Sequence, residues 1–296
     1  RKQYNVPVEC DYARAYDDAV EGLHKAVEQG KRLGLIVSPM LTCEEAYLLA
    51  ALARAIDPQA ILAVGPIPVQ GEDKTFPKDN PDGFRVCAEK APNARGVRRV
   101  LEAFAPGHVQ SFEDMLKTLG VGTGKSGIGA VIITGNYPTD WVSAEIESAL
   151  SGKFSVLIDT HKTALCAKAD IVLPGATFAE KAGTYENHRN VMQAFDQAIP
   201  VIELAKTEGQ LALDMMSVLE GAPANERRAK PVLVQSSMGQ VAAGVQVALP
   251  RAKMFDAAQV RQEMASKLDA LSDLLTRVKL PPAAAAEKPD MQVVEL

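Results

Sequence analysis

The stretch SVLIDTHKTALCAKADIVLPGATFAEKAGTYENHRNVMQ, residues 155–193, decides the fold of this chain. It contains two short apolar runs rich in β-branched side chains, 155–158 and 171–173, and a polar loop follows each of them. Such runs are typical of neighbouring strands in a parallel sheet, whose loops gather at the carboxyl edge and form a ligand site. The stretch therefore predicts an α/β fold with a site at that edge.

Outside this stretch, predicted strands and helices alternate along the chain. Residues 32–37 and 61–64 are predicted strands, and the helix between them begins with a capping box made by Thr42 and Glu45. Residues 128–134, IGAVIIT, form the strongest predicted strand. The alternation predicts a doubly wound, mostly parallel sheet of about five strands with helices on both faces, plus a C-terminal helical extension.

The predicted domain organisation has three parts. Five prolines in residues 65–95 exclude a long regular element there, and Thr139 or Asp140 is predicted to cap a helix that reaches Leu150. The three parts are an N-terminal helix in residues 1–30, the α/β domain in 31–221, and a linker, apolar segment, amphipathic helix (256–279) and loose tail in 222–296.

Composition excludes several classes of function. A net charge of −5 and a pI near 5.5 give no basic footprint for nucleic acid. No apolar run reaches the roughly 18–20 residues that span a bilayer, and the first residues lack the apolar core of a signal peptide. The chain begins with Arg1 rather than Met, so we expect it to be processed or excised from a longer protein. Four cysteines are spaced too widely for a zinc or iron–sulfur site and are predicted reduced thiols: Cys10, Cys43, Cys87 and Cys166.

Common catalytic and nucleotide-binding motifs do not fit this sequence. The glycine-rich stretch 120–129 is one residue short of a phosphate loop and follows a helix instead of a strand. There is no G-x-S-x-G, and no predicted strand leads into G-x-G-x-x-G. The histidines show no metal-binding spacing, although His161 and His188 lie in loops at the predicted edge.

Polar residues after the predicted strands are the candidate site. Asp159 ends a strand, where it could accept hydrogen bonds from a ribose or a purine amino group, or cap the following turn. Asn136 ends another strand and could satisfy loop backbone groups or bind a ligand. Glu180, Asn187 and Arg189 could pair with one another and hold the long loop, or contact a cofactor.

The sequences of several segments resemble the molybdopterin oxidoreductase superfamily. Residues 169–193 resemble its ADVVLP…E..GT..N..GR.Q signature, 131–141 its strand followed by G-x-N-P, and 38–54 its T-N-E-E-x-Y-L-L-x-x-L-A-R segment. Residues 71–77 and 84–101, GEDKTFP and FRVCAEKAPNARGVRRVL, are most similar to the G-subunit (75 kDa) type of bacterial NADH:quinone oxidoreductase. The resemblance covers roughly residues 30–220.

The resemblance implies doubly wound α/β domains that, in catalytic members, bind a molybdopterin guanine dinucleotide at the carboxyl edge of the sheet. Departures include His188-Arg189-Asn190 in place of Glu-Gly-Arg and the lack of clustered cysteines, so iron–sulfur clusters are expected only in a missing upstream part. The positions that match the motif as cofactor-edge residues are Asn136, Asp159, Thr160, Pro174, Glu180, Gly183, Thr184 and Asn187.

The function expected from the resemblance is a scaffold domain of a redox enzyme subunit of the G type, with a vestigial guanine dinucleotide site and no catalysis or cofactor of its own. We expect its partners to be other subunits of a respiratory or redox complex, with a cytoplasmic location, peripheral to the inner membrane through those subunits. Two alternatives stay open. One is a fragment of a catalytic, formate dehydrogenase-like molybdopterin oxidoreductase that binds the guanine dinucleotide; the other is a stand-alone interaction module.

Overall fold

A five-stranded parallel sheet forms the centre of the molecule, in the order β4-β3-β7-β8-β9. From β3 the chain continues to β4 on one side of the sheet, and from β7 it continues to β8 and β9 on the other side. The direction in which strands are added therefore reverses between β3 and β7. The computed structural model describes residues 1–3, 6–78, 80, 82–120, 127–221 and 254–281. The strands span Arg32–Val37 (β3), Ile61–Val64 (β4), Ile128–Thr134 (β7), Phe154–Asp159 (β8) and Ile171–Pro174 (β9).

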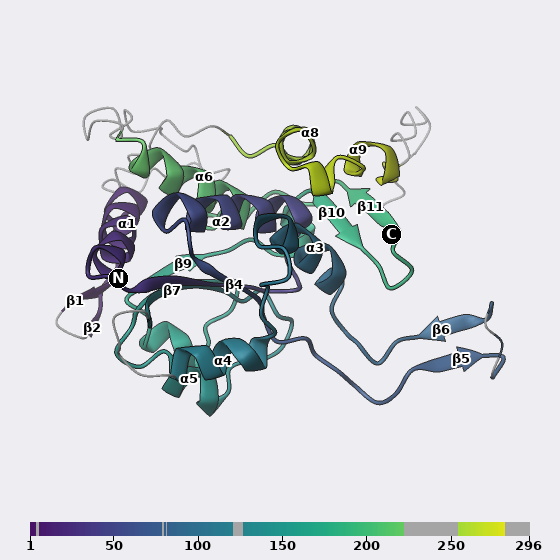
Figure 1. Ribbon diagram of the computed structural model, residues 1–296, viewed down its shortest axis with the longest axis horizontal. Coiled ribbons are helices and arrows are strands. Elements are labelled where there is room, and N and C mark those ends of the chain that lie inside the picture. Colours follow the sequence, from purple (N-terminus) through teal and green to yellow (C-terminus); the bar gives the residue numbers. More distant parts are fainter. Residues whose placement is uncertain (4–5, 79, 81, 121–126, 222–253, 282–296) are drawn as a thin grey trace, which may run out of the picture.

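Helices cover both faces of this sheet. Alternate side chains of a strand point to opposite faces, and on β3 Leu33 and Leu35 join one apolar core while Ile36 joins the other. Figure 1 shows α1, α2 and α6 on one side of the sheet and α4 and α5 on the other. The predicted doubly wound α/β fold is therefore confirmed. The helices span Tyr12–Glu28 (α1), Cys43–Ile56 (α2), Ala94–Phe104 (α3), Phe112–Gly120 (α4), Ala144–Ala149 (α5) and Glu208–Leu219 (α6).

Helix α2 is the most enclosed helix of the larger layer. It starts with the predicted capping box, because the Glu45 amide donates to Thr42 Oγ1 at 3.2 Å and Glu45 Oε2 accepts from the Thr42 amide at 3.0 Å. It contacts β3, α3 and α6, and even Glu44 and Glu45 in its first turn are fully buried. A helix enclosed on so many sides needs partners for every polar group it carries inward.

Helix α5 begins later than predicted. Its N-cap is Ser143 and not Thr139 or Asp140. The Asp140 carboxylate accepts from the Val142 amide at 3.2 Å, so it closes a turn before the helix. Short-range bonding of this kind is the usual competitor of helix capping by Asp.

In the part of the chain that the structure describes, three antiparallel strand pairs lie outside the central sheet. The β10–β11 hairpin packs near α2 and α3, whereas the β5–β6 hairpin lies within the proline-rich stretch 65–95 and projects away from the body (Figure 1). Their strands span Lys2–Gln3 (β1), Val6–Pro7 (β2), Lys74–Phe76 (β5), Phe84–Val86 (β6), Gly183–Glu186 (β10) and Met192–Phe195 (β11). Two 3-10 turns span Ala164–Ala167 (η1) and Phe178–Glu180 (η2).

The predicted single helix over 256–279 is wrong in one respect. The segment consists of α8 (Ala257–Lys267), a 3-10 turn η3 (Asp269–Leu271) and α9 (Leu274–Arg277). Leu268 adopts an extended backbone, with φ −123° and ψ 106°, and breaks the helix. The bend lets the apolar seam follow the curved surface of the core, where Met264, Leu271 and Leu274 are fully buried.

Two sequence predictions lie outside the described residues: the linker with its apolar segment, and most of the tail. The predicted division into three parts stays a prediction. Within the described ranges, no helix combines the length and the apolar character that a bilayer crossing requires.

Candidate site at the carboxyl edge of the sheet

The carboxyl ends of the central strands meet at the reversal point of the sheet, where open α/β sheets bind ligands. Thr134 joins the ends of β3 and β7, because its hydroxyl accepts from the Ser38 amide at 2.8 Å. Two further strands end beside it, with Asp159 of β8 in register with Pro174 of β9. The loops that leave these ends carry the polar residues predicted from the sequence.

Asp159 holds the loops together at this edge. Its Oδ1 accepts from the backbone amides of Asn136 at 2.9 Å and Thr160 at 2.8 Å, and its Oδ2 accepts from the Trp141 indole at 2.9 Å. Gly135 permits this approach, since a Cβ there would lie 2.2 Å from the Asp159 carboxyl carbon. Of the two roles considered for Asp159, the structure shows the capping of turns.

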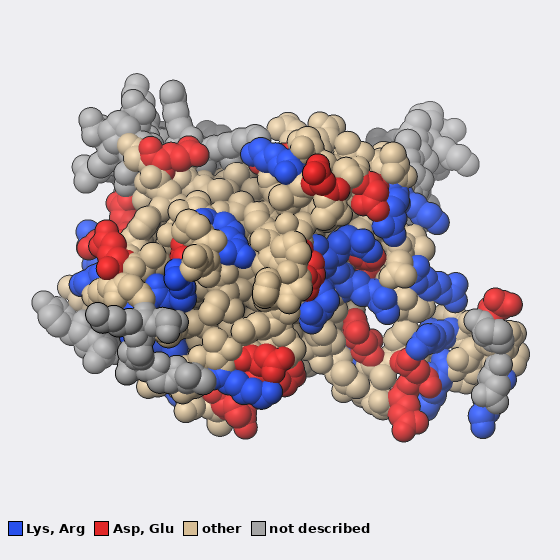
Figure 2. Space-filling model, viewed as in Figure 1, with Lys and Arg blue, Asp and Glu red and all other residues tan. Residues whose placement is uncertain are grey.

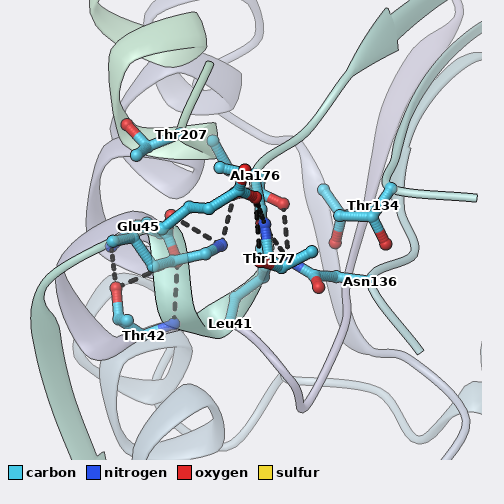
Figure 3. Close-up of polar contacts among 12 residues, drawn as sticks. Leu41, Thr42, Glu45, Thr134, Asn136, Ala176, Thr177 and Thr207 are labelled. Atoms are coloured by element: carbon cyan, nitrogen blue, oxygen red, sulfur yellow. Dashed lines mark hydrogen bonds and ion pairs between the residues drawn. The ribbon is translucent and has the colours of Figure 1, made fainter. Parts of the chain in front are cut away.

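Asn136 connects the β7 loop to two other segments. Its backbone has a positive φ of 73°, a conformation that asparagine tolerates better than most residues. Its side-chain amide donates to the Ala176 carbonyl at 2.8 Å and to Glu208 Oε1 at 2.9 Å (Figure 3). A single side chain therefore links the ends of β7 and β9 to the first turn of α6.

Beneath these loops lies a charge cluster of Glu45, Lys181 and Glu208, whose side chains have no exposed surface. The Lys181 ammonium donates to both oxygens of Glu45, at 3.0 and 3.2 Å, and to Glu208 Oε2 at 2.5 Å. The cluster ties α2, the loop before β10 and α6 into one polar unit.

One proton compensates for the excess acid in this cluster. Burial raises the pKa of Glu208 to about 8, Glu45 adds to the rise, and the Lys181 charge opposes it. Burial also disfavours the charged form of Glu45, but Lys181 and the surrounding hydrogen bonds outweigh it and lower the pKa of that group. For Lys181, the two carboxyl groups outweigh burial and raise its pKa. At neutral pH the cluster thus holds Lys181 and Glu45 charged and Glu208 protonated.

A second buried cluster joins Glu44, Arg261 and Thr184. Glu44 Oε1 accepts from Arg261 Nε at 3.0 Å and from the Thr184 hydroxyl at 2.7 Å, and Glu44 Oε2 accepts from the Thr184 amide at 2.8 Å. Burial raises the pKa of Glu44, and Arg261 opposes the rise. Gly183 is needed beside this cluster, because a Cβ there would lie 2.3 Å from the methyl group of Thr42.

Glu180 caps its own short turn. Its Oε2 accepts from the Thr177 amide at 2.7 Å and from the Thr177 hydroxyl at 2.8 Å, while its Oε1 accepts from the Ile202 amide at 2.9 Å. The carboxylate therefore fixes the loop after β9 at two points.

Asn187 closes the turn of the β10–β11 hairpin. Its side-chain oxygen accepts from the backbone amides of Arg189 at 2.9 Å and Val191 at 3.1 Å, and Asn190 completes the turn with a positive φ of 57°. The predicted mutual pairing of Glu180, Asn187 and Arg189 is thus wrong for Glu180, because its carboxylate caps the separate η2 turn. Each carboxyl or amide group holds its own segment of the loop.

With this geometry in place, a comparison with family models gives one match. Residues 109–212 match the molybdopterin oxidoreductase family. The matched region runs from the segment before α4 into the first turns of α6 and includes the loops after β7, β8 and β9, but not those after β3 and β4. No match was found among curated proteins.

All eight sequence-predicted positions lie inside the region that matches the molybdopterin oxidoreductases. Whether they contact a cofactor stays a prediction. The structure places them in two groups. At the sheet edge lie Asn136, Asp159, Thr160 and Pro174; on the loop and hairpin that follow lie Glu180, Gly183, Thr184 and Asn187.

Sequence reasoning missed Lys181, Glu208 and Trp141, and it assigned Glu45 only to a helix cap. The one available signal was position: Lys181 directly follows Glu180 in the motif, and Glu208 follows the helix N-cap Thr207. Across the described ranges, no group of three or more His, Cys, Asp or Glu residues is placed to hold a metal ion.

Proposed function

We propose that this chain is a scaffold domain of a redox enzyme subunit that keeps the molybdopterin oxidoreductase sheet edge for its shape. The match of residues 109–212 supports membership of a redox enzyme. The hydrogen bonds of Asp159 carry the rest of the proposal, because the carboxylate that would face a ligand is 5% exposed and bonded within the chain.

A guanine dinucleotide places a demanding requirement on this edge. Guanine presents N–H donors on its Watson–Crick edge, so a site for it needs an acceptor that faces the ligand. Asp159 Oδ1 already accepts from Asn136 and Thr160 and more weakly from the His161 amide at 3.4 Å, and Oδ2 accepts from Trp141. The residues present fit a loop-holding role and would fit guanine only if the indole moved away.

The type of subunit is inferred from residues 71–101, which include the projecting β5–β6 hairpin. The sequence of residues 71–101, which resembles the G subunit of NADH:quinone oxidoreductase, forms the β5–β6 hairpin and the first two turns of α3. We therefore assign the chain to a subunit of that type, with other subunits of a respiratory or redox complex as partners. In this proposal it lies on the cytoplasmic side, peripheral to the membrane through those partners.

The alternative is a fragment of a catalytic molybdopterin oxidoreductase that binds the guanine dinucleotide. The observation that favours it is the exposed rim next to Asp159. The Thr160 hydroxyl lies 2.9 Å from His161 Nδ1, and the His161 ring is exposed, so a ligand at the edge would meet a hydroxyl and an imidazole.

The single tryptophan of the chain gives a direct test, because Trp141 donates to Asp159. GMP and GDP are titrated into the purified chain while indole fluorescence and the melting temperature are recorded. The scaffold proposal expects no saturable change. A saturable rise in melting temperature, or stoichiometric molybdenum with pterin fluorescence in the purified chain, overturns it in favour of the alternative.

The Asp159→Asn variant tests the loop-holding role directly, through the stability of the chain and the fluorescence of Trp141. If the carboxylate holds the loops, the variant loses about 1–3 kcal/mol of stability and shifts the Trp141 emission. Asp170→Asn is the matched control, since Asp170 accepts from the Ser155 amide at 2.8 Å at the amino end of the same strand. It should leave the Trp141 emission unchanged. An Asp159→Asn variant as stable as the parent would contradict the loop-holding role.

A further inference from the structure

The β5–β6 hairpin exposes large apolar side chains far from the core. Figure 1 shows it projecting from the body on two long connections. Phe76 and Phe84 face each other in the hairpin register and are 54% and 69% exposed, and Val86 is 38% exposed. Val69, on the connection leading to the hairpin, is 68% exposed.

The arm is held by backbone pairing, which continues to an antiparallel bridge between Val69 and Glu89, and its large apolar side chains are exposed. Each of its strands has three residues, and an isolated two-stranded hairpin is marginal in water even when longer. Opposed residues of an antiparallel pair lie on the same face, so Phe76 and Phe84 form one apolar face together with Val86, two residues further along the strand. An exposed aromatic face on a projecting arm is the kind of surface that proteins bury against a partner.

The chain next to the arm is strongly basic, although the protein as a whole carries a net charge of −5. Residues 85–99 contain five Lys or Arg and one Glu. Arg95, Arg98 and Arg99 follow one another at helical spacing on α3, so they share one side of that helix. Arg99 is neutralised by Glu186 through two bonds of 2.8 and 2.6 Å, which leaves Arg95 and Arg98 as the charges toward solvent.

Contacts with the β10–β11 turn bring further arginines to the same place. Arg95 Nη1 donates to the Asn190 side chain at 3.0 Å. Arg277 donates to the Asn190 carbonyl at 3.3 Å and is itself paired with Asp273 at 2.7 Å. Arg189, the preceding residue, is exposed. Figure 2 shows the cationic side chains gathered beside the hollow between the body and the arm.

We propose that the arm and this arginine face together dock an acidic protein surface that has an apolar recess for Phe76 and Phe84. The partner is a protein rather than a nucleic acid because Phe76, Phe84 and Val86 expose apolar surface, which an apolar recess of a protein buries. Asp73 pairs with Arg85 on the arm, so the arginines on and beside α3 supply the charge toward the partner. Aromatic anchors surrounded by arginines are typical of protein interfaces, and the arginines call for carboxylates opposite them. The proposal is independent of what the sheet edge binds.

The test places a photo-crosslinking phenylalanine analogue at position 84 of the full chain, expressed in its native cells. Phe178 is the matched control, because its side chain is also 69% exposed but lies on η2. The expected result is a cross-link from position 84, and not from 178, to a peptide of another protein that is rich in Asp and Glu. Absence of any cross-link from position 84 overturns the proposal.

Reversing the charge of two arginines then distinguishes specific docking from non-specific cross-linking. The double variant Arg98→Glu/Arg189→Glu should reduce the cross-link yield about tenfold, and added salt should reduce it for the unaltered chain. Lys25→Glu is the control, since Lys25 is exposed on α1 at the opposite end of the molecule. A yield insensitive to charge reversal, a cross-link only to a second copy of this chain, or a cross-link to nucleic acid each overturns the proposal.

Discussion

Two consecutive glutamates at the start of α2, both fully buried, belong to two different clusters. Glu44 meets one cation and one threonine, with Arg261 reaching inward from α8. Glu45 meets Lys181 and a second carboxyl group, Glu208. The first cluster therefore pairs one carboxyl group with one cation, whereas the second contains two carboxyl groups and one cation.

This difference teaches what each cluster holds in place. The Glu44 cluster fastens the C-terminal segment and the β10 hairpin to α2, and its cation retains a side-chain exposure of 10%. The Glu45 cluster fastens the loops of the sheet edge, and its cation is completely enclosed. An enclosed ammonium between two carboxyl groups is stable only while one of them carries a proton.

The largest expected effect comes from Lys181→Met. It leaves Glu45 as an uncompensated buried charge, so we expect a loss of about 3–5 kcal/mol in the free energy of unfolding. Urea denaturation at neutral pH measures it. Lys206→Met serves as a control, because Lys206 pairs with Asp214 but retains 17% exposure and should cost clearly less. A loss below about 1 kcal/mol for Lys181→Met would show that the cluster is not a charged unit.

Arg261→Leu should have a smaller effect, about 1–3 kcal/mol. Glu44 keeps both Thr184 donors, and its raised pKa means that it takes up a proton at modest cost. The loss should be local, so hydrogen exchange is the suitable measurement. Faster exchange is expected in residues 257–281 with unchanged protection in β7 and β8. Equal acceleration in both regions would contradict the separation of the two clusters.

Thr184→Val keeps the side-chain shape but removes one donor to Glu44 and one acceptor for Arg261 Nε, at 2.7 and 2.9 Å. Its backbone amide still donates at 2.8 Å, and Arg261 Nε still reaches Glu44 Oε1. We therefore expect a loss of about 1–2 kcal/mol, because the hydroxyl takes part in two hydrogen bonds. Thermal unfolding measures it, with Thr184→Ser as the variant that restores the hydroxyl. If Thr184→Ser were the less stable of the two, packing and not the hydroxyl would be responsible.

Glu208→Gln should have the smallest effect near pH 6, within about 1 kcal/mol, because an amide replaces a carboxyl group that is already neutral. The pH dependence of the free energy of unfolding distinguishes this variant from the parent chain. The folded pKa of Glu208, about 8, exceeds the unfolded value, so its stabilising contribution is full below the unfolded pKa and is lost as pH rises toward 8. Urea titrations from pH 5 to 8 should show a steeper decline in the parent than in Glu208→Gln, which keeps only the contribution of Glu44. Parallel curves would contradict the shared proton.

The fold was predictable because its signals are local. The apolar runs that became β7 and β8, and the capping box at Thr42, are each contained within a few residues. The break at Leu268 was not predictable, because spacing alone fits a straight helix and the bend follows the shape of the core. The helix start at Ser143 was missed because Asp140 uses its carboxylate in a preceding turn.

The candidate site was predictable only in part. Asp159 ends β8 and Asn136 lies two residues after β7, so topology places both at one edge; Glu180 lies further along the loop after β9. Lys181 and Glu45 are separated by 136 residues, and nothing in their local sequence tells which carboxylate the lysine meets. A lysine beside a loop motif is normally solvated, and burial reverses that expectation only when the partners are known.

The long separations in both clusters set an order for folding during synthesis. Glu45 leaves the ribosome 136 residues before Lys181, and Glu44 precedes Arg261 by 217 residues. A nascent chain that stops within the sheet therefore carries two carboxyl groups that enter the interior without their cations only at the cost of a buried charge or of taking up a proton. Final burial of α2 waits for the loop after β9 and for α8, which makes its closure a late and cooperative step.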